Sequence, residues 1–75
     1  MRYHIVLRPE PEGGFTVMVP ALPGCITWAA DLEGARAMAR EAIEAYVASL
    51  VRHGEPVPSG EDELIETVDI QAANG

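Results

Sequence analysis

The chain has 75 residues, enough for one domain with a small hydrophobic core, which we place over residues 1–75. Its formal charge is −7, from 12 acidic residues against five arginines, a balance that argues against direct nucleic-acid binding because phosphate contacts need a cationic surface. No apolar run approaches the ~18 residues of a membrane span, and one cysteine gives no disulfide framework, so the composition predicts a cytoplasmic protein without a membrane partner.

The first half of the chain predicts two strands joined by a hairpin loop. Residues 2–8 alternate, with Tyr3, Ile5 and Leu7 on one side, and residues 15–19 alternate in the same way. Residues 9–14 are rich in proline, glutamate and glycine, which is typical of a turn. We expect the tyrosine side of this hairpin to pack under a helix, which turns Met18 toward the opposite face.

A stiff connector follows at residues 19–25. Pro20 and Pro23 fix two φ angles and remove two backbone donors, and Gly24 supplies a turn position, so this segment cannot be a central strand. Residues 25–30 predict a third strand whose register the sequence leaves open. Trp28 therefore either completes the core or lies on the open face of the sheet as an interface residue.

The second half predicts one long helix and then a fourth strand. Asp31 is a good N-cap, apolar residues recur at helical spacing, and Gly54 with two following prolines ends the helix. Residues 63–70 alternate with interleaved acids and predict the last strand, which leaves residues 71–75 as a frayed tail. The predicted fold is α+β, in the order β-β-β-α-β, with one helix on an antiparallel or mixed sheet.

Catalytic chemistry finds little support in the sequence. The three predicted N-terminal strands carry no carboxylates that could converge on divalent ions. Cys25 has no histidine near it in sequence, and His4 and His53 lack companions at ligand spacing. We therefore predict no enzyme, no catalytic residues, no cofactor and no metal site. A core this small often gains stability by self-association, so a homo-oligomer, dimer or tetramer, is expected.

Three segments in order carry a resemblance to a known family. Residues 13–25 read GGFTVMVPALPGC, residues 31–47 read DLEGARAMAREAIEAYV, and residues 54–58 read GEPVP. Together they resemble the HicB-type antitoxin domain, over residues 3–58. The resemblance implies a partial ribonuclease-H-like fold without nuclease activity, and a basic HicA-type ribonuclease toxin as the protein partner.

Two departures from the family pattern limit what the resemblance implies. Ala29 and Ala30 stand where the family usually has a Gly-Asp pair, and the sequence shows no C-terminal DNA-binding segment, so autorepression is not carried over. The alternative is an orphan oligomeric module that binds another protein or a small ligand. For the toxin-binding reading, the candidate contact residues lie on the connector, the open face and the acidic strand: Met18, Ala21, Leu22, Trp28, Glu63, Glu66 and Asp69.

Overall fold

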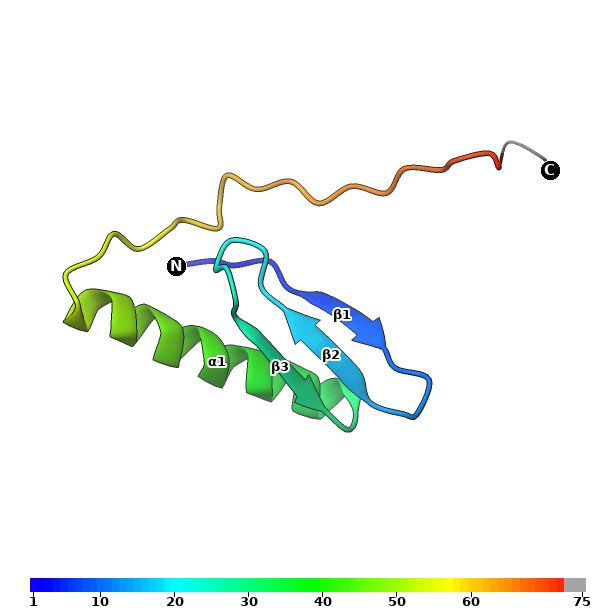
Figure 1. Ribbon diagram of the computed structural model, residues 1–75, viewed down its shortest axis with the longest axis horizontal. Coiled ribbons are helices and arrows are strands. Elements are labelled where there is room, and N and C mark those ends of the chain that lie inside the picture. The colour runs from blue at the N-terminus through cyan, green and yellow to red at the C-terminus, as the bar shows by residue number, and fades with distance from the viewer. Residues whose placement is uncertain (73–75) are drawn as a thin grey trace.

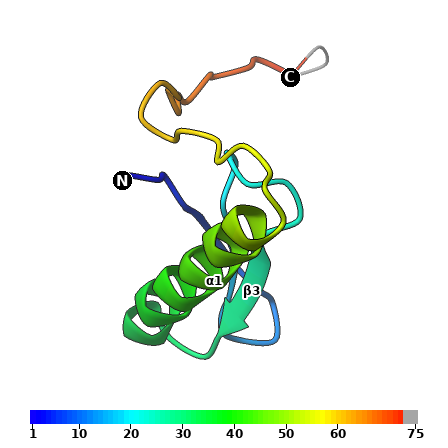
Figure 2. The ribbon, with the colours of Figure 1, turned by 90° about the vertical axis from the view of Figure 1, so that its left-hand side faces the viewer.

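The computed structural model describes residues 1–72, in which three strands precede one helix (Figure 1). The elements are β1 (Val6–Pro9), β2 (Phe15–Met18), β3 (Ile26–Ala29) and α1 (Leu32–Arg52). The strands form one antiparallel sheet in the order β1-β2-β3, and α1 lies across one face of it, as the turned view shows (Figure 2). The predicted α+β class and the order of these four elements are confirmed.

The predicted hairpin loop joins β1 to β2. The Glu10 amide donates to the Gly14 carbonyl at 3.0 Å, and the Gly13 amide donates to the Glu10 carbonyl at 3.0 Å. Both glycines have positive φ, 105° and 80°, a conformation that other residues adopt only with strain. The turn chemistry of the sequence therefore fixed this loop locally.

The connector between β2 and β3 consists of two consecutive turns. The Leu22 amide donates to the Val19 carbonyl at 3.0 Å, and the Cys25 amide donates to the Leu22 carbonyl at 2.9 Å. Pro23 occupies the second position of the second turn, and Gly24, with φ 79°, occupies the third, as a type II turn requires. The two prolines thus sit where their fixed φ angles help and where no amide is needed.

Both ends of α1 are capped. The Asp31 carboxylate accepts a hydrogen bond from the Gly34 amide at 2.7 Å, which confirms the predicted N-cap. At the other end His53 is the C-cap, and Gly54 follows it with φ 68°. The Glu55 amide donates to the Leu50 carbonyl and the Gly54 amide to the Val51 carbonyl, which is the hydrogen-bond pattern of a Schellman motif.

The core consists of two small clusters on the helix side of the sheet. The first joins Val17 and Ala29 to two helix alanines, with three partly buried residues around it: Ile5, Leu7 and Phe15. The second joins the connector residues Val19, Leu22 and Cys25 to the C-terminal half of α1. The alternation predicted this face correctly, because Tyr3, Ile5 and Leu7 all pack toward the helix.

Two sequence predictions about strands were wrong. The fourth strand is absent within the described residues: residues 63–70 are extended but pair with no strand, although their alternation is that of a strand. Alternation shows that a segment is able to form a strand, but it does not supply the backbone partner that a strand needs. β1 also begins at Val6 rather than at residue 2. Val6 pairs with Met18, the last residue of β2, and the connector turns start at Val19, so the residues before Val6 have no β2 residue to pair with. Residues 73–75 of the predicted frayed tail lie outside the described residues.

Candidate protein-binding surface

The strand register defines the face of the sheet that α1 leaves uncovered. Val6 is opposite Met18, which is opposite Ile26, and these three form an apolar row across the sheet. Arg8, Thr16 and Trp28 form the next row on the same side, because residues two apart in a strand share a face. We call these six residues the open face: Val6, Arg8, Thr16, Met18, Ile26 and Trp28.

The open face is apolar and accessible along β3. Ile26 is 62% exposed and Trp28 is 54% exposed, while Met18 is partly buried between its neighbours. Of the two readings that the sequence left open for Trp28, the register selects the open face. Ile26 was missed as a candidate, although its position two residues before Trp28 in the same predicted strand was the signal that could have found it.

The Trp28 ring lies against the hairpin loop. A Cβ atom built on Gly14 would come within 2.4 Å of Trp28 Cζ2 and 2.7 Å of the Ala29 carbonyl oxygen. The absence of a side chain at Gly14 therefore leaves the space in which the indole sits. An aromatic residue held in one place against backbone is pre-organised for binding, because less rotamer freedom is lost on association.

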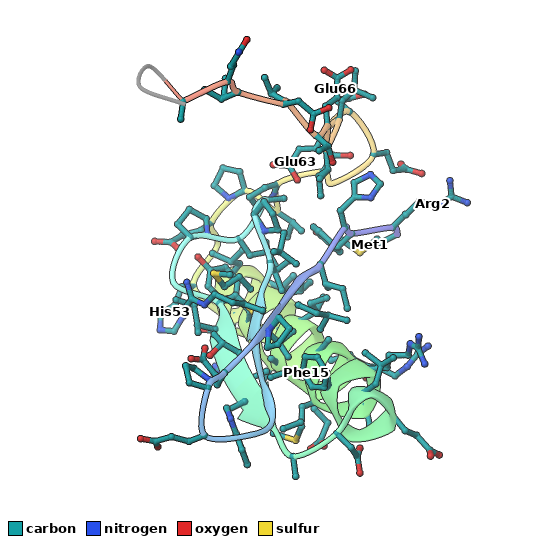
Figure 3. The ribbon with its side chains drawn as sticks, turned by 90° about the vertical axis from the view of Figure 1, so that its right-hand side faces the viewer. Met1, Arg2, Phe15, His53, Glu63 and Glu66 are labelled. Carbon is teal, nitrogen blue, oxygen red and sulfur yellow. The ribbon has the colours of Figure 1, made fainter. Side chains whose placement is uncertain are left out.

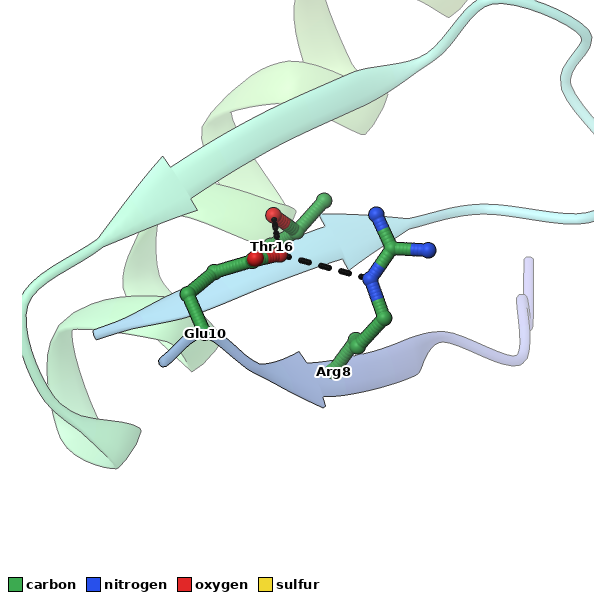
Figure 4. A network of polar contacts seen from close by, with 3 residues as sticks. All are labelled: Arg8, Glu10 and Thr16. Carbon is green, nitrogen blue, oxygen red and sulfur yellow. Dashed lines mark hydrogen bonds and ion pairs between the residues drawn. The ribbon is translucent and has the colours of Figure 1, made fainter. Parts of the chain in front are cut away.

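A polar network borders the tryptophan on the open face (Figure 4). Thr16 Oγ1 donates a hydrogen bond to Glu10 Oε2, and Arg8 Nε lies 3.3 Å from the same oxygen. The Thr16 hydrogen bond, and secondarily Arg8, hold the pKa of the Glu10 carboxyl below its ordinary value. With Trp28 these side chains line a surface hollow of about 710 Å³. Apolar and paired polar groups side by side are what a protein interface requires.

The connector borders this face at the opposite end of β2 from the hairpin. Ala21 is half-buried, whereas the Leu22 side chain is fully buried in the second core cluster. Tyr46 Oη donates a hydrogen bond to the Pro23 carbonyl at 2.7 Å and so ties the connector to α1. Leu22 therefore holds the shape of the connector from inside, and it presents no side chain at the surface.

The acidic residues predicted for the last strand lie on an extended arm, which we define as residues 61–72. Glu63, Glu66 and Asp69 belong to this arm, and Figure 3 shows the first two away from the sheet and helix. The arm holds five acidic residues and no basic residue. It is thus separate from the open face in this conformation, and the structure does not bring the two groups of candidate residues together.

The remaining candidates for chemistry are positioned for structural roles. Burial raises the pKa of the Cys25 thiol, which belongs to the second core cluster. His53 Nδ1 lies 2.7 Å from the Ser49 carbonyl, so this side chain helps to cap the end of α1. Over residues 1–72, no three side chains among His, Cys, Asp and Glu converge on a possible metal position. The helix of the same region is not apolar enough to cross a membrane.

The described residues therefore form a three-stranded sheet covered by one helix, with an exposed aromatic face and an acidic arm. A family model described as the HicB-like antitoxin of bacterial toxin-antitoxin systems matches residues 3–73. The chain belongs to this HicB-like antitoxin family, which confirms the resemblance drawn from the sequence.

Several curated proteins are similar over most of their length. A UPF0150 protein of Thermoplasma acidophilum is 38% identical over 65 residues, which cover 87% of this chain and 94% of the relative. One UPF0150 protein of Synechocystis is 35% identical over 68 residues, covering 91% of this chain and 85% of the relative. A second UPF0150 protein of the same organism is 32% identical over 73 residues, which cover 97% of this chain and 100% of the relative. The similarity therefore includes the arm as well as the sheet and helix.

Proposed function

We propose that this chain neutralises a small basic ribonuclease of the HicA type by binding it and covering its active face. Membership of the antitoxin family supports a toxin as the kind of partner. The observation that carries the proposal is the open face, where Ile26 and Trp28 remain more than half exposed in a chain of charge −7. A monomeric protein rarely leaves a tryptophan and neighbouring apolar residues uncovered without a binding role.

To inhibit a ribonuclease by occlusion, this chain only has to bind it tightly and in an orientation that covers its catalytic groups. A ribonuclease must bring a phosphodiester to its catalytic groups, so a protein seated over those groups stops the reaction without chemistry of its own. An acidic surface suits this task, since the toxin face that binds RNA has to be basic. Charge complementarity also speeds the encounter between the two proteins and makes it sensitive to salt.

The proposed contacts divide into an apolar centre and an acidic periphery. Met18 and Trp28 form the centre, and Ala21 extends it along the connector. Leu22 contributes from beneath by holding the connector turns. Glu63, Glu66 and Asp69 supply the acidic charge, carried by the arm. Buried aromatic residues dominate the affinity of such interfaces, whereas charges at the periphery mainly set the association rate.

The experiment is inhibition of RNA cleavage by the purified basic partner, titrated with this chain. The partner is obtained by affinity capture from the native host, followed by mass measurement and by a ribonuclease assay before and after it is stripped off. The proposal expects a small basic protein whose RNA cleavage starts only on release. Recovery of this chain alone, with no latent ribonuclease, would instead support the orphan module.

Substitutions then test the surface. Trp28→Ala should weaken inhibition roughly 30-fold, which corresponds to about 2 kcal/mol for loss of a central aromatic residue. Charge reversal with Glu66→Lys and Asp69→Lys should slow association and reduce its salt dependence. Val51→Ala is the matched control, because this side chain is 64% exposed on α1, away from the open face. If a folded variant that combines Trp28→Ala, Glu66→Lys and Asp69→Lys inhibits the ribonuclease as well as the unchanged chain does, these contacts are excluded.

A further inference from the structure

A groove lies between α1 and the N-terminal segment of the chain. It has a volume of about 660 Å³, and its lining is largely apolar, with two arginines and one glutamate: Met1, Tyr3, Arg36, Ala39, Arg40, Ile43, Glu44, Val47 and Ala48. α1 packs chiefly against β3 and β2, and the groove opens between the helix and the residues that precede β1. β1 is also the outer strand of the sheet, and its far edge has no strand beside it within residues 1–72.

The arm has the complementary pattern. In an extended conformation Leu64, Val68 and Ile70 point to one side, and they are 86%, 73% and 82% exposed. Glu66 is the fourth residue on that side, between the leucine and the valine. The arm also leaves Glu63 Oε1 buried without a hydrogen-bond partner among the described residues. In this conformation the apolar side chains of the arm are exposed to solvent, and one carboxylate oxygen is buried without a hydrogen bond among the described residues.

The dimensions and charges of the two features agree. Leu64 to Ile70 spans about 20 Å in a strand, and Arg36 to Val47 spans about 16 Å along the helix. The apolar side chains of the arm match the apolar lining of the groove, and Glu66 on the same side of the arm matches the charge of Arg36 and Arg40. A strand added to the free edge of β1 would in addition gain backbone hydrogen bonds along its length.

The chain is anchored just before the arm begins. Tyr3 Oη donates a hydrogen bond to the Pro58 carbonyl at 2.6 Å. Gly60 is buried so closely against Arg2 and Tyr3 that a Cβ atom there would lie 2.6 Å from the Arg2 carbonyl oxygen. From this fixed point the arm runs outward, away from its own helix and sheet (Figure 1). Its apolar side chains are therefore exposed and are not among the residues that line the groove of their own chain.

We propose that residues 63–70 form a strand on the β1 edge of a second copy of this chain. Leu64, Val68 and Ile70 then fill the groove of that copy, and Glu66 lies beside its Arg36 and Arg40. Reciprocal exchange of the two arms gives a closed, symmetric dimer. Glu63 and Asp69 face away from the groove and stay available to a basic partner. Glu66, which is also a proposed toxin contact, is taken up by the dimer, so the two proposals are tested at different places: the oligomeric state tests the dimer, and Trp28→Ala on the open face tests toxin binding.

The first test is the oligomeric state of the full chain, measured by sedimentation equilibrium over a range of concentrations. The expected species is a dimer of 8.0 kDa chains. Val68→Asp should raise the dimer dissociation constant by about 100-fold or more, because it places an unpaired charge in the apolar groove. Val51→Asp is the matched control: the same substitution at a side chain that is 64% exposed, outside the groove, should leave the constant unchanged. A wild-type monomer at every concentration, or a dimer that tolerates Val68→Asp, would overturn the proposal.

Two further measurements separate exchange from docking of the arm on its own chain. Glu66→Arg should weaken the dimer, and adding Arg40→Glu in the same chain should restore it. In a Cys25→Ser background, chains carrying Glu66→Cys are mixed with chains carrying Arg40→Cys and oxidised. Exchange predicts a covalent dimer of two different chains. A single chain that carries both Glu66→Cys and Arg40→Cys is oxidised in parallel. If it forms a disulfide within the chain while the mixture forms no cross-link, the arm folds back on its own groove instead.

Discussion

Replacement of Leu22 by alanine tests whether the connector is part of the core. The Leu22 side chain is 0% exposed, and it packs in the second cluster with Val19, Cys25 and the C-terminal half of α1. Buried Leu→Ala substitutions cost about 2–5 kcal/mol, and more when the site cannot collapse. The two turns, with their prolines, hold the backbone here, so we expect about 3–4 kcal/mol.

That loss is large for so small a protein. A 75-residue domain has a free energy of unfolding of about 4–11 kcal/mol, so Leu22→Ala would remove about a quarter of it or more. The melting temperature should fall by roughly 12–32 °C, at about 4–8 °C for each kcal/mol.

The assay is urea unfolding at one fixed protein concentration, since self-association would add to the apparent stability. Val51→Ala, at a side chain that is 64% exposed, should change the free energy of unfolding by no more than about 0.5 kcal/mol. A loss below 1 kcal/mol for Leu22→Ala, at an unchanged slope with urea, would refute the reasoning that the connector is a structural part of the core.

Three other outcomes follow from the structure. Gly14→Ala should cost about 1–3 kcal/mol and shift the fluorescence of the single tryptophan, because a methyl group at φ 80° would displace Trp28; an unchanged spectrum contradicts this. The pKa of the Glu10 carboxyl is lowered in the folded chain, so the carboxylate stabilises the fold above the ordinary glutamate pKa of about 4.3, and this contribution is lost as the pH falls through the folded pKa. Glu10→Gln should therefore flatten the acid side of a curve of stability against pH. An unchanged acid side would count against the network. Burial raises the pKa of the Cys25 thiol, so thiol reagents at pH 8 should label the native chain at least about 100-fold more slowly than the urea-unfolded chain, and equal rates would show an exposed thiol.

Local chemistry made much of this fold predictable from the sequence. Asp31 caps α1 through its own carboxylate, Gly54 ends it in a left-handed conformation, and Pro23-Gly24 forms its turn from neighbouring residues alone. Each of these signals depends on a few adjacent residues. The apolar face of the hairpin followed in the same way, from the period-two alternation of residues 2–8 and 15–19.

What the sequence could not provide was pairing between distant segments. The register of β3, and with it the exposure of Ile26 and Trp28, depends on which residue faces Thr16 across the sheet. The contact between Trp28 and Gly14 depends on the same pairing. Residues 63–70 failed as a strand prediction for this reason as well: their side-chain pattern is local, whereas a strand partner, which residues 1–72 do not provide, has to come from a distant segment. The candidate surface was therefore found only in part, with Met18 and Trp28 named and Ile26 overlooked.

The thinness of the molecule has a consequence for how its partners can be mapped. The shortest extent of the Cα trace is 17 Å, which corresponds to one sheet and one helix. Val17 and Ala35 pack in the same core cluster between these two layers, so a partner bound to either outer surface is only about one layer of backbone away from them. Chemical-shift changes on binding will therefore spread from one surface to the other. Paramagnetic broadening by a dissolved probe, which reports solvent access directly, will distinguish an occupied sheet from an occupied helix.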